Sequence, residues 1–72
     1  MSNTQTQEIF LRLPAVSQKT GIGKTSIYQR VKEGTFPPPI KLGERAVAWV
    51  DSEVSEWMAS RITASRSRGV LQ

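Results

Sequence analysis

Residues 13–34, LPAVSQKTGIGKTSIYQRVKEG, form the stretch that decides the fold. A short helix is expected to begin at Pro14, because proline suits the first helical position, and to stop at Gly21, because glycine adopts a left-handed cap at little cost. A second helix is expected over 23–33, ended by Gly34. Two short helices joined by a glycine-containing turn of about three residues are typical of a helix-turn-helix.

The second helix of this pair has a narrow apolar side and a wide polar side. Ile27 and Val31, four residues apart, are expected to dock it on the core. The other side chains are polar or basic, and several recur at spacings that let them reach one groove together. We expect DNA contacts from Lys24, Thr25, Ser26, Tyr28, Gln29, Arg30 and Lys32.

The roles within this set differ. Gln29 can pair with adenine in a major groove, whereas lysine can donate to guanine or neutralise a phosphate. Tyr28, next to an apolar residue, has a ring that can lie half in the core while its hydroxyl reaches a phosphate. Arg30 has two interpretations: a DNA contact, or a surface ion pair with Glu33 that is worth little energy.

The run GKTS at 23–26 also resembles the end of the phosphate-binding loop of NTPases. That motif needs a glycine at position 18, where the chain has Gln18, and a strand before the loop, where a helix is expected here. We therefore interpret the run as a helix N-terminus facing a DNA phosphate or a base edge. An ordinary solvated helix face is the alternative.

Short strands are expected on both sides of the helix pair. Upstream, Ile9, Leu11 and Leu13 alternate with other residues. Downstream, residues 35–39 contain three consecutive prolines, which make a stiff, extended connector. The following stretch IKLGERAVAW (40–49) alternates apolar residues with others around a break, which predicts a β-hairpin.

This hairpin would form the wing. Its inward side chains are expected to be Ile40, Leu42, Val47 and Trp49. Lys41 and Arg45 are then left on the solvent side near the tip, where Gly43 permits a close approach to the DNA backbone or entry into a minor groove. The alternative is an exposed hairpin with ordinary charges, which Glu44 at the tip favours.

A third helix is expected from Asp51, a residue type that caps helix N-termini well. Its apolar stripe would close the core and consists of Val54, Trp57, Met58 and Ile62. Glu53 and Glu56 suit the positive end of the helix dipole, so no catalytic carboxylate pair is inferred. Phe36, Trp49 and Trp57 are interpreted as packing residues rather than base-stacking ones. Three uses remain open for Arg61, Arg66 and Arg68: phosphate binding, pairing with another protomer, or a solvated tail.

Composition excludes most catalytic classes. The chain has 72 residues, a net charge of +4, no cysteine and no histidine, so thiolate nucleophiles, imidazole bases and cysteine or histidine metal sites are ruled out. We expect no enzymatic activity, no cofactor and no metal. No apolar run approaches the roughly 20 residues that span a bilayer, so we expect a cytoplasmic protein without a membrane partner. Residues 19–45 contain six basic and two acidic residues, which suits a polyanionic partner.

Taken in order, these motifs resemble the AlpA family of prophage regulatory proteins over residues 11–58. The matching pieces are Leu13 and Pro14, Thr20 and Gly21, Ser26 to Tyr28, Gly34 to Pro37, Lys41 to Gly43, Arg45, Trp49, and Glu56 with Trp57. The resemblance implies a winged helix-turn-helix of the kind shared with the MerR family and small phage excisionases. It also implies a transcriptional activator or repressor, or a recombination directionality factor. The chain departs from the family at Gly23, where a serine-like cap is more usual, which implies a weaker cap.

The sequence thus predicts a mainly α fold with a small β-hairpin, a winged helix-turn-helix over 9–62, with a disordered N-terminal arm (1–8) and a flexible basic tail (63–72). We expect it to bind double-stranded DNA site-specifically as a transcriptional regulator of a prophage or genomic island. One alternative is an excisionase that binds attachment-site DNA and assists an integrase. Another is a protein-interaction adaptor without DNA binding. Since so small a domain reads few base pairs, the further partners expected are other copies on tandem sites, an integrase or RNA polymerase.

Overall fold

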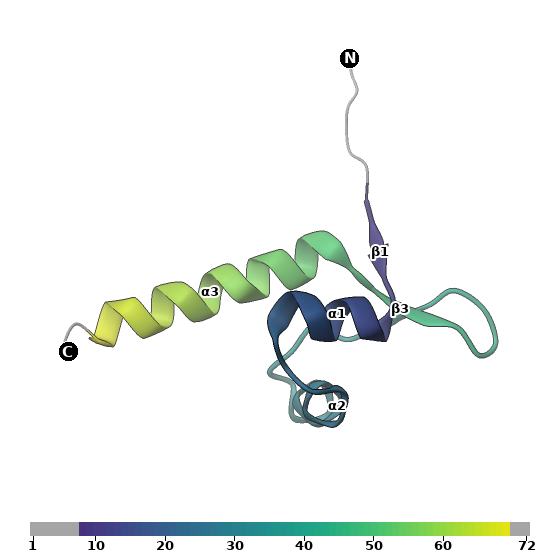
Figure 1. Cartoon of the computed structure of the whole chain (residues 1–72), viewed down its shortest axis with the longest axis horizontal. Helices are drawn as coiled ribbons and strands as arrows, with labels where there is room; N and C mark the ends of the chain where they lie inside the picture. The colour runs from purple at the N-terminus through teal and green to yellow at the C-terminus, as the bar shows by residue number, and fades with distance from the viewer. Residues whose placement is uncertain (1–7, 70–72) are drawn as a thin grey trace, which may run out of the picture.

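The computed structural model describes residues 8–69, with side chains as far as Ser67. Residues 1–7 of the expected N-terminal arm and 70–72 of the expected tail lie outside this range. The elements in chain order are β1 (Phe10–Leu11), α1 (Leu13–Thr20), α2 (Lys24–Glu33), β2 (Ile40–Lys41), β3 (Val47–Val50) and α3 (Asp51–Gly69) (Figure 1). Helices with one small antiparallel sheet confirm the predicted winged helix-turn-helix class.

The helices α1 and α2 each end at the glycine expected from the sequence. Gly21 and Gly34 follow the two helices with φ angles of 76° and 81°, left-handed values that glycine adopts without a steric penalty. Pro14 lies in the first turn of α1. Gly23 supplies α2 with no side-chain cap, so the first amides of α2 lack a side-chain acceptor from that position.

The core lies between the helix pair, the sheet and the first turns of α3. Its buried members are Val16, Ile27, Phe36, Trp49 and Val54. Trp49 is fully buried, and the half-buried ring of Trp57 meets Phe36 edge to face with centroids 4.8 Å apart. These three aromatic rings are therefore packing residues, as predicted.

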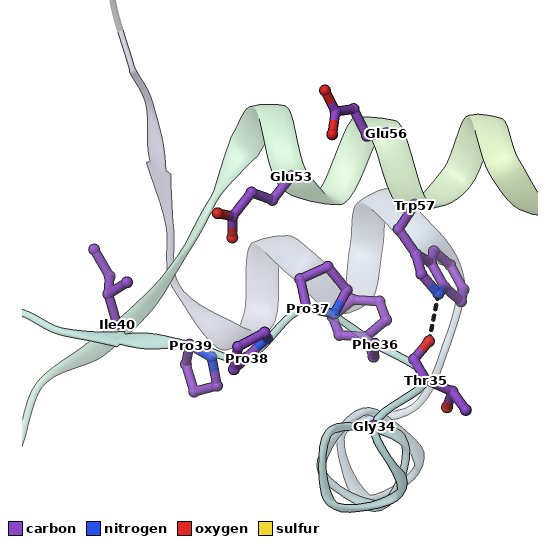
Figure 2. Close-up of a pocket in the computed structure, with 10 residues that line it drawn as sticks. All are labelled: Gly34, Thr35, Phe36, Pro37, Pro38, Pro39, Ile40, Glu53, Glu56 and Trp57. Atoms are coloured by element: carbon purple, nitrogen blue, oxygen red, sulfur yellow. Dashed lines mark hydrogen bonds between the residues drawn. The ribbon is translucent and has the colours of Figure 1, made fainter.

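The proline connector between α2 and β2 is held by both tryptophans. Trp49 Nε1–H donates to the carbonyl oxygen of Pro37 at 2.9 Å. Trp57 Nε1–H donates to the carbonyl oxygen of Thr35 at 2.6 Å, as Figure 2 shows. These bonds supply donors to carbonyl groups of a segment that belongs to no helix or strand. The connector thereby fixes where the hairpin lies relative to α2.

The sheet has the order β1-β3-β2, with β3 in the middle and both neighbours antiparallel to it. In the hairpin, Ile40 is opposite Ala48 and Lys41 is opposite Val47. Leu42 N–H donates to the carbonyl oxygen of Ala46 at 2.7 Å, which closes a tight turn over 43–45.

This register corrects the expected faces of the hairpin. Residues directly opposite each other in a sheet share a face, so Lys41 lies on the face of Val47 and Trp49, and Ile40 lies on the other. Ile40 and Leu42 are accordingly 36% and 46% exposed, not inward-facing. The prediction was wrong because shifting the pairing by one residue exchanges the two faces of a strand, and the apolar alternation alone did not fix the turn length.

The third helix, α3, follows β3 without a loop. Lys19 Nζ donates to the carboxylate of Asp51 and, at 2.8 Å, to Ser55 Oγ, which ties α1 to the first turn of α3. The helix continues to Gly69, so the tail expected from residue 63 is helical as far as that residue. No proline or glycine interrupts the sequence between Ile62 and Gly69. Within residues 8–69, no helix is both long enough and apolar enough to cross a membrane.

Candidate nucleic-acid interface

Helix α2 lies on the core through a narrow strip and presents the rest of its surface to solvent. Ile27 is fully buried and Val31 is half-buried. The seven α2 residues predicted to contact DNA are all exposed: Lys24, Thr25, Ser26, Tyr28, Gln29, Arg30 and Lys32. The helix therefore has the narrow apolar side and wide polar side expected from the sequence.

The exposed surface of α2 divides into a centre and two flanks. With 3.6 residues per turn, Gln29 and Thr25 lie roughly opposite the buried strip, at the centre of the exposed face. Lys24, Tyr28 and Lys32 follow one another along one flank at intervals of four residues. Arg30 and Ser26 lie on the other flank, so the predicted set does not form one continuous row.

The flank of Tyr28 is turned toward the sheet. The Tyr28 ring meets the Trp49 ring edge to face, with centroids 5.9 Å apart and planes at 61°. Tyr28 remains 47% exposed, so it combines a packing contact with an accessible surface, as its ambiguous sequence position suggested. Since Trp49 belongs to β3, this contact shows which sheet face is directed at α2.

The corrected register places Lys41 on that same sheet face. Lys41 is opposite Val47, and Val47 packs on the core cluster to which Trp49 belongs. Lys41 is exposed at the margin of this face. One basic side chain of the wing is therefore on the α2 side of the sheet, beside the flank that carries Lys24 and Lys32.

Arg45 lies at the tip of the wing. It is exposed within the tight turn, next to Glu44, which is exposed as well. The backbone amides of Leu42 and Gly43 both donate to the carbonyl oxygen of Ala46, at 2.7 and 3.3 Å. These bonds fix the turn on which Arg45 is presented.

Gln29 and Arg30 differ in their intramolecular partners. Gln29 Nε2 donates to a carboxylate oxygen of Glu33 at 3.4 Å, a long hydrogen bond on an exposed face. The alternative ion pair of Arg30 with Glu33 is not formed, and the ion pair found among the described residues joins Lys19 to Asp51. Arg30 instead lines a groove between α2 and α3 together with Arg61. The sequence leaves the use of Arg61 open, because the 30 residues between the two arginines carry no local signal of their proximity.

The charges and donors of this face have the chemistry that suits an anionic ligand. Basic side chains surround the exposed face of α2, and Thr25 and Ser26 add hydroxyl donors at its first turn. No group of three acidic, cysteine or histidine residues able to hold a metal ion occurs in the part of the chain that the structure describes.

Comparison with known proteins identifies relatives of this chain. Residues 9–62 match the family described as "Prophage CP4-57 regulatory protein (AlpA)". An uncharacterized protein, ORF88, of Enterobacteria phage P4 is 50% identical over 64 residues, which cover 89% of this chain and 72% of that protein. The DNA-binding transcriptional activator AlpA of Escherichia coli K12 is 37% identical over 65 residues, which cover 82% of this chain and 93% of that protein. No solved structure matches the chain.

Proposed function

The chain belongs to the AlpA family of prophage regulatory proteins, and on that premise we propose that it binds double-stranded DNA site-specifically as a non-catalytic transcriptional regulator of a prophage or genomic island. A relative of known role, the activator AlpA of Escherichia coli, supports this assignment. The protein then acts in the cytoplasm, where the nucleoid is accessible to it.

The observation that carries the proposal is the exposed polar face of α2. Apart from Ile27 and Val31, every side chain of this helix is exposed, and the exposed set contains hydroxyl, amide and cationic groups. An α-helix about 10–12 Å in diameter fits the major groove, which is about 12 Å wide. No described feature of the fold blocks an approach to this face, since α1, the sheet and α3 all pack on its opposite side.

The mechanism is positional. Gln29, at the centre of the exposed face, has the donor and acceptor geometry that reads adenine. Lys24 and Lys32 on one flank and Lys41 on the wing bind phosphates, which fixes the depth and register of α2 without carrying sequence information. Gln29 exchanges its weak bond to Glu33 for a base contact.

A single domain of this size contacts too few base pairs to select one site in a genome. We therefore propose that it binds as several copies on tandem sites or together with a larger partner, either RNA polymerase or an integrase. The excisionase role uses the same DNA-binding surface and differs in where the sites lie.

Mapping of the binding sites of the full chain in its host genome tests the proposal. Enriched sites at promoters, with a shared sequence motif, are the expected result. Sites confined to the arms of an attachment sequence would instead assign the excisionase role. An absence of enriched sites, with no shift of duplex DNA at physiological salt, would favour the protein-interaction adaptor and contradict the proposal.

A further inference from the structure

A groove on the α3 side of the helix-turn-helix contains two arginines that come from distant parts of the chain. It lies between α2 and α3, and Arg30 and Arg61 line it together with Thr20, Ile22, Trp57, Met58 and Ile62. Its floor is thus apolar, and the charged side chains along it are both positive. Both arginines are exposed.

The charged residues that line this groove have one sign, whereas Glu33 lines a separate hollow that Arg30 also borders. None of its lining residues is acidic, and the ion pair identified within residues 8–69 is Lys19 with Asp51, on α1 and α3. Two guanidinium groups on one groove repel each other unless an anion lies between or beside them. A guanidinium presents a planar fork of donors that matches the oxygens of a phosphate. Two such groups on one groove therefore suit a phosphate better than a single exposed cation does.

A neighbouring hollow, which shares Trp57 with this groove, has the reverse character. There the proline connector and α3 line a hollow that contains Glu53 and Glu56 (Figure 2). These carboxylates repel a polyanion, whereas the groove of Arg30 and Arg61 attracts one. The charge on α3 therefore changes along its length, from the carboxylates of its first turns, which disfavour DNA, to Arg61, which favours it.

The groove is also on the correct side of α2. In Figure 1, α2 is seen end-on, with the hairpin extending to one side of it and the far half of α3 to the other. A duplex whose major groove follows the axis of α2 has one phosphate strand on each of these two sides. The wing therefore lies toward one strand and the far half of α3 toward the other, and Arg30 and Arg61 line the groove between α2 and α3.

We propose that Arg61 of α3, together with Arg30 of α2, binds a backbone phosphate of the strand that borders the major groove opposite the wing. This inference rests on the proposed function, because it takes duplex DNA as the ligand. In addition to closing the core, α3 then binds DNA. The protein thereby contacts both phosphate strands that border the major groove occupied by α2.

Arg61→Gln tests the proposal, with Arg66→Gln as the matched control. Both residues are exposed on α3 and both changes remove one positive charge, but Arg66 lies five residues further on, about 140° around the helix, and does not line the groove. The affinity of the full chain for a cognate duplex is measured by fluorescence anisotropy from 50 to 200 mM salt. Circular dichroism verifies that both variants are folded.

The expected result is that Arg61→Gln reduces the slope of log affinity against log salt by about 0.9, which is the value for one phosphate contact. That change corresponds to roughly a 3.5-fold smaller loss of affinity over the fourfold salt range. Arg66→Gln should leave the slope within error of the wild type, and the base preference should be unchanged in both variants.

Equal slopes for Arg61→Gln and Arg66→Gln would overturn the inference and leave the proposed function intact. A wild-type protein that binds no duplex would instead refute the proposed function. In that second case, binding of an acidic peptide that is lost in Arg61→Gln would assign the groove to a protein partner and also overturn the DNA contact.

Discussion

The ring of Tyr28 rests edge to face on the ring of Trp49, with centroids 5.9 Å apart. Trp49 is fully buried, and its indole N–H donates a hydrogen bond to the carbonyl oxygen of Pro37 in the connector. Tyr28, by contrast, is about half exposed on α2. The proposed DNA-reading helix is therefore braced from its side as well as from its buried strip. This brace sets the position of α2 relative to the wing.

Replacement of Tyr28 tests the brace. Tyr28→Ala removes the ring pair, which is worth about 0.5–1.5 kcal/mol beyond the apolar area it covers, so the free energy of unfolding should fall by at least that amount. Tyr28→Phe keeps the ring and should preserve stability. Urea denaturation measures both. If the phenylalanine variant lost as much stability as the alanine variant, the hydroxyl rather than the ring would be the stabilising group.

Trp57 is expected to be indispensable for folding. Its ring packs on Phe36 and its indole N–H satisfies the carbonyl of Thr35. Trp57→Ala should cost about 3–5 kcal/mol, which is comparable with the whole stability of a domain this small, so the far-ultraviolet circular dichroism of the variant should be that of an unfolded chain. Trp57→Phe keeps most of the packing and loses about 0.5–1.5 kcal/mol with the hydrogen bond, so it should remain folded. A folded alanine variant would contradict this role.

The hairpin register predicts opposite outcomes for two apolar residues of the wing. Leu42 is on the outer, solvent-facing side, so Leu42→Gln should change the unfolding free energy by no more than about 0.5 kcal/mol. Val47 packs against the core cluster, so Val47→Gln should cost about 1–3 kcal/mol by placing an unpaired amide there. Thermal unfolding of the two variants compares them directly. A larger loss for Leu42→Gln would mean that the register is shifted by one residue.

The flank of α2 beside the wing is expected to contact phosphate. Lys32→Gln should weaken binding to all duplexes alike and reduce the slope of log affinity against log salt by about 0.9. Glu33→Gln is the control of opposite sign, because it removes a negative charge from the neighbouring position and should tighten binding. A change in base preference for Lys32→Gln, in a selection from random sequences, would show that Lys32 reads a base instead.

Local signals in the sequence were sufficient for the elements that depend on them. Gly21 and Gly34 end α1 and α2 at the expected residues because glycine readily adopts the left-handed conformation of a helix cap. The four-residue spacing of Ile27 and Val31 is typical of the buried side of a helix. The tryptophans were recognised as packing residues for the same reason: they fall on apolar faces.

Features that depend on tertiary placement were not predictable in this way. The predicted faces of β2 are the reverse of the observed ones, because the length of the turn, and not the apolar alternation, decides whether Ile40 or Lys41 lies on the α2 side of the sheet. The separation of Arg30 from the lysine flank follows from helix geometry, but its proximity to Arg61 depends on how α3 crosses α2. Helical structure beyond Ile62 had no apolar pattern to indicate it.

The central claim is that α2 reads bases in a major groove, and Gln29 tests it most directly because it lies at the centre of the exposed face. Selection of bound duplexes from a random library is carried out with the wild-type chain and with Gln29→Ala. The account predicts a defined wild-type motif in which the variant loses preference at one base pair, at a cost of about 1–3 kcal/mol there, and keeps it elsewhere. An identical motif for both proteins, or an equal loss at every position, would contradict base readout by this helix.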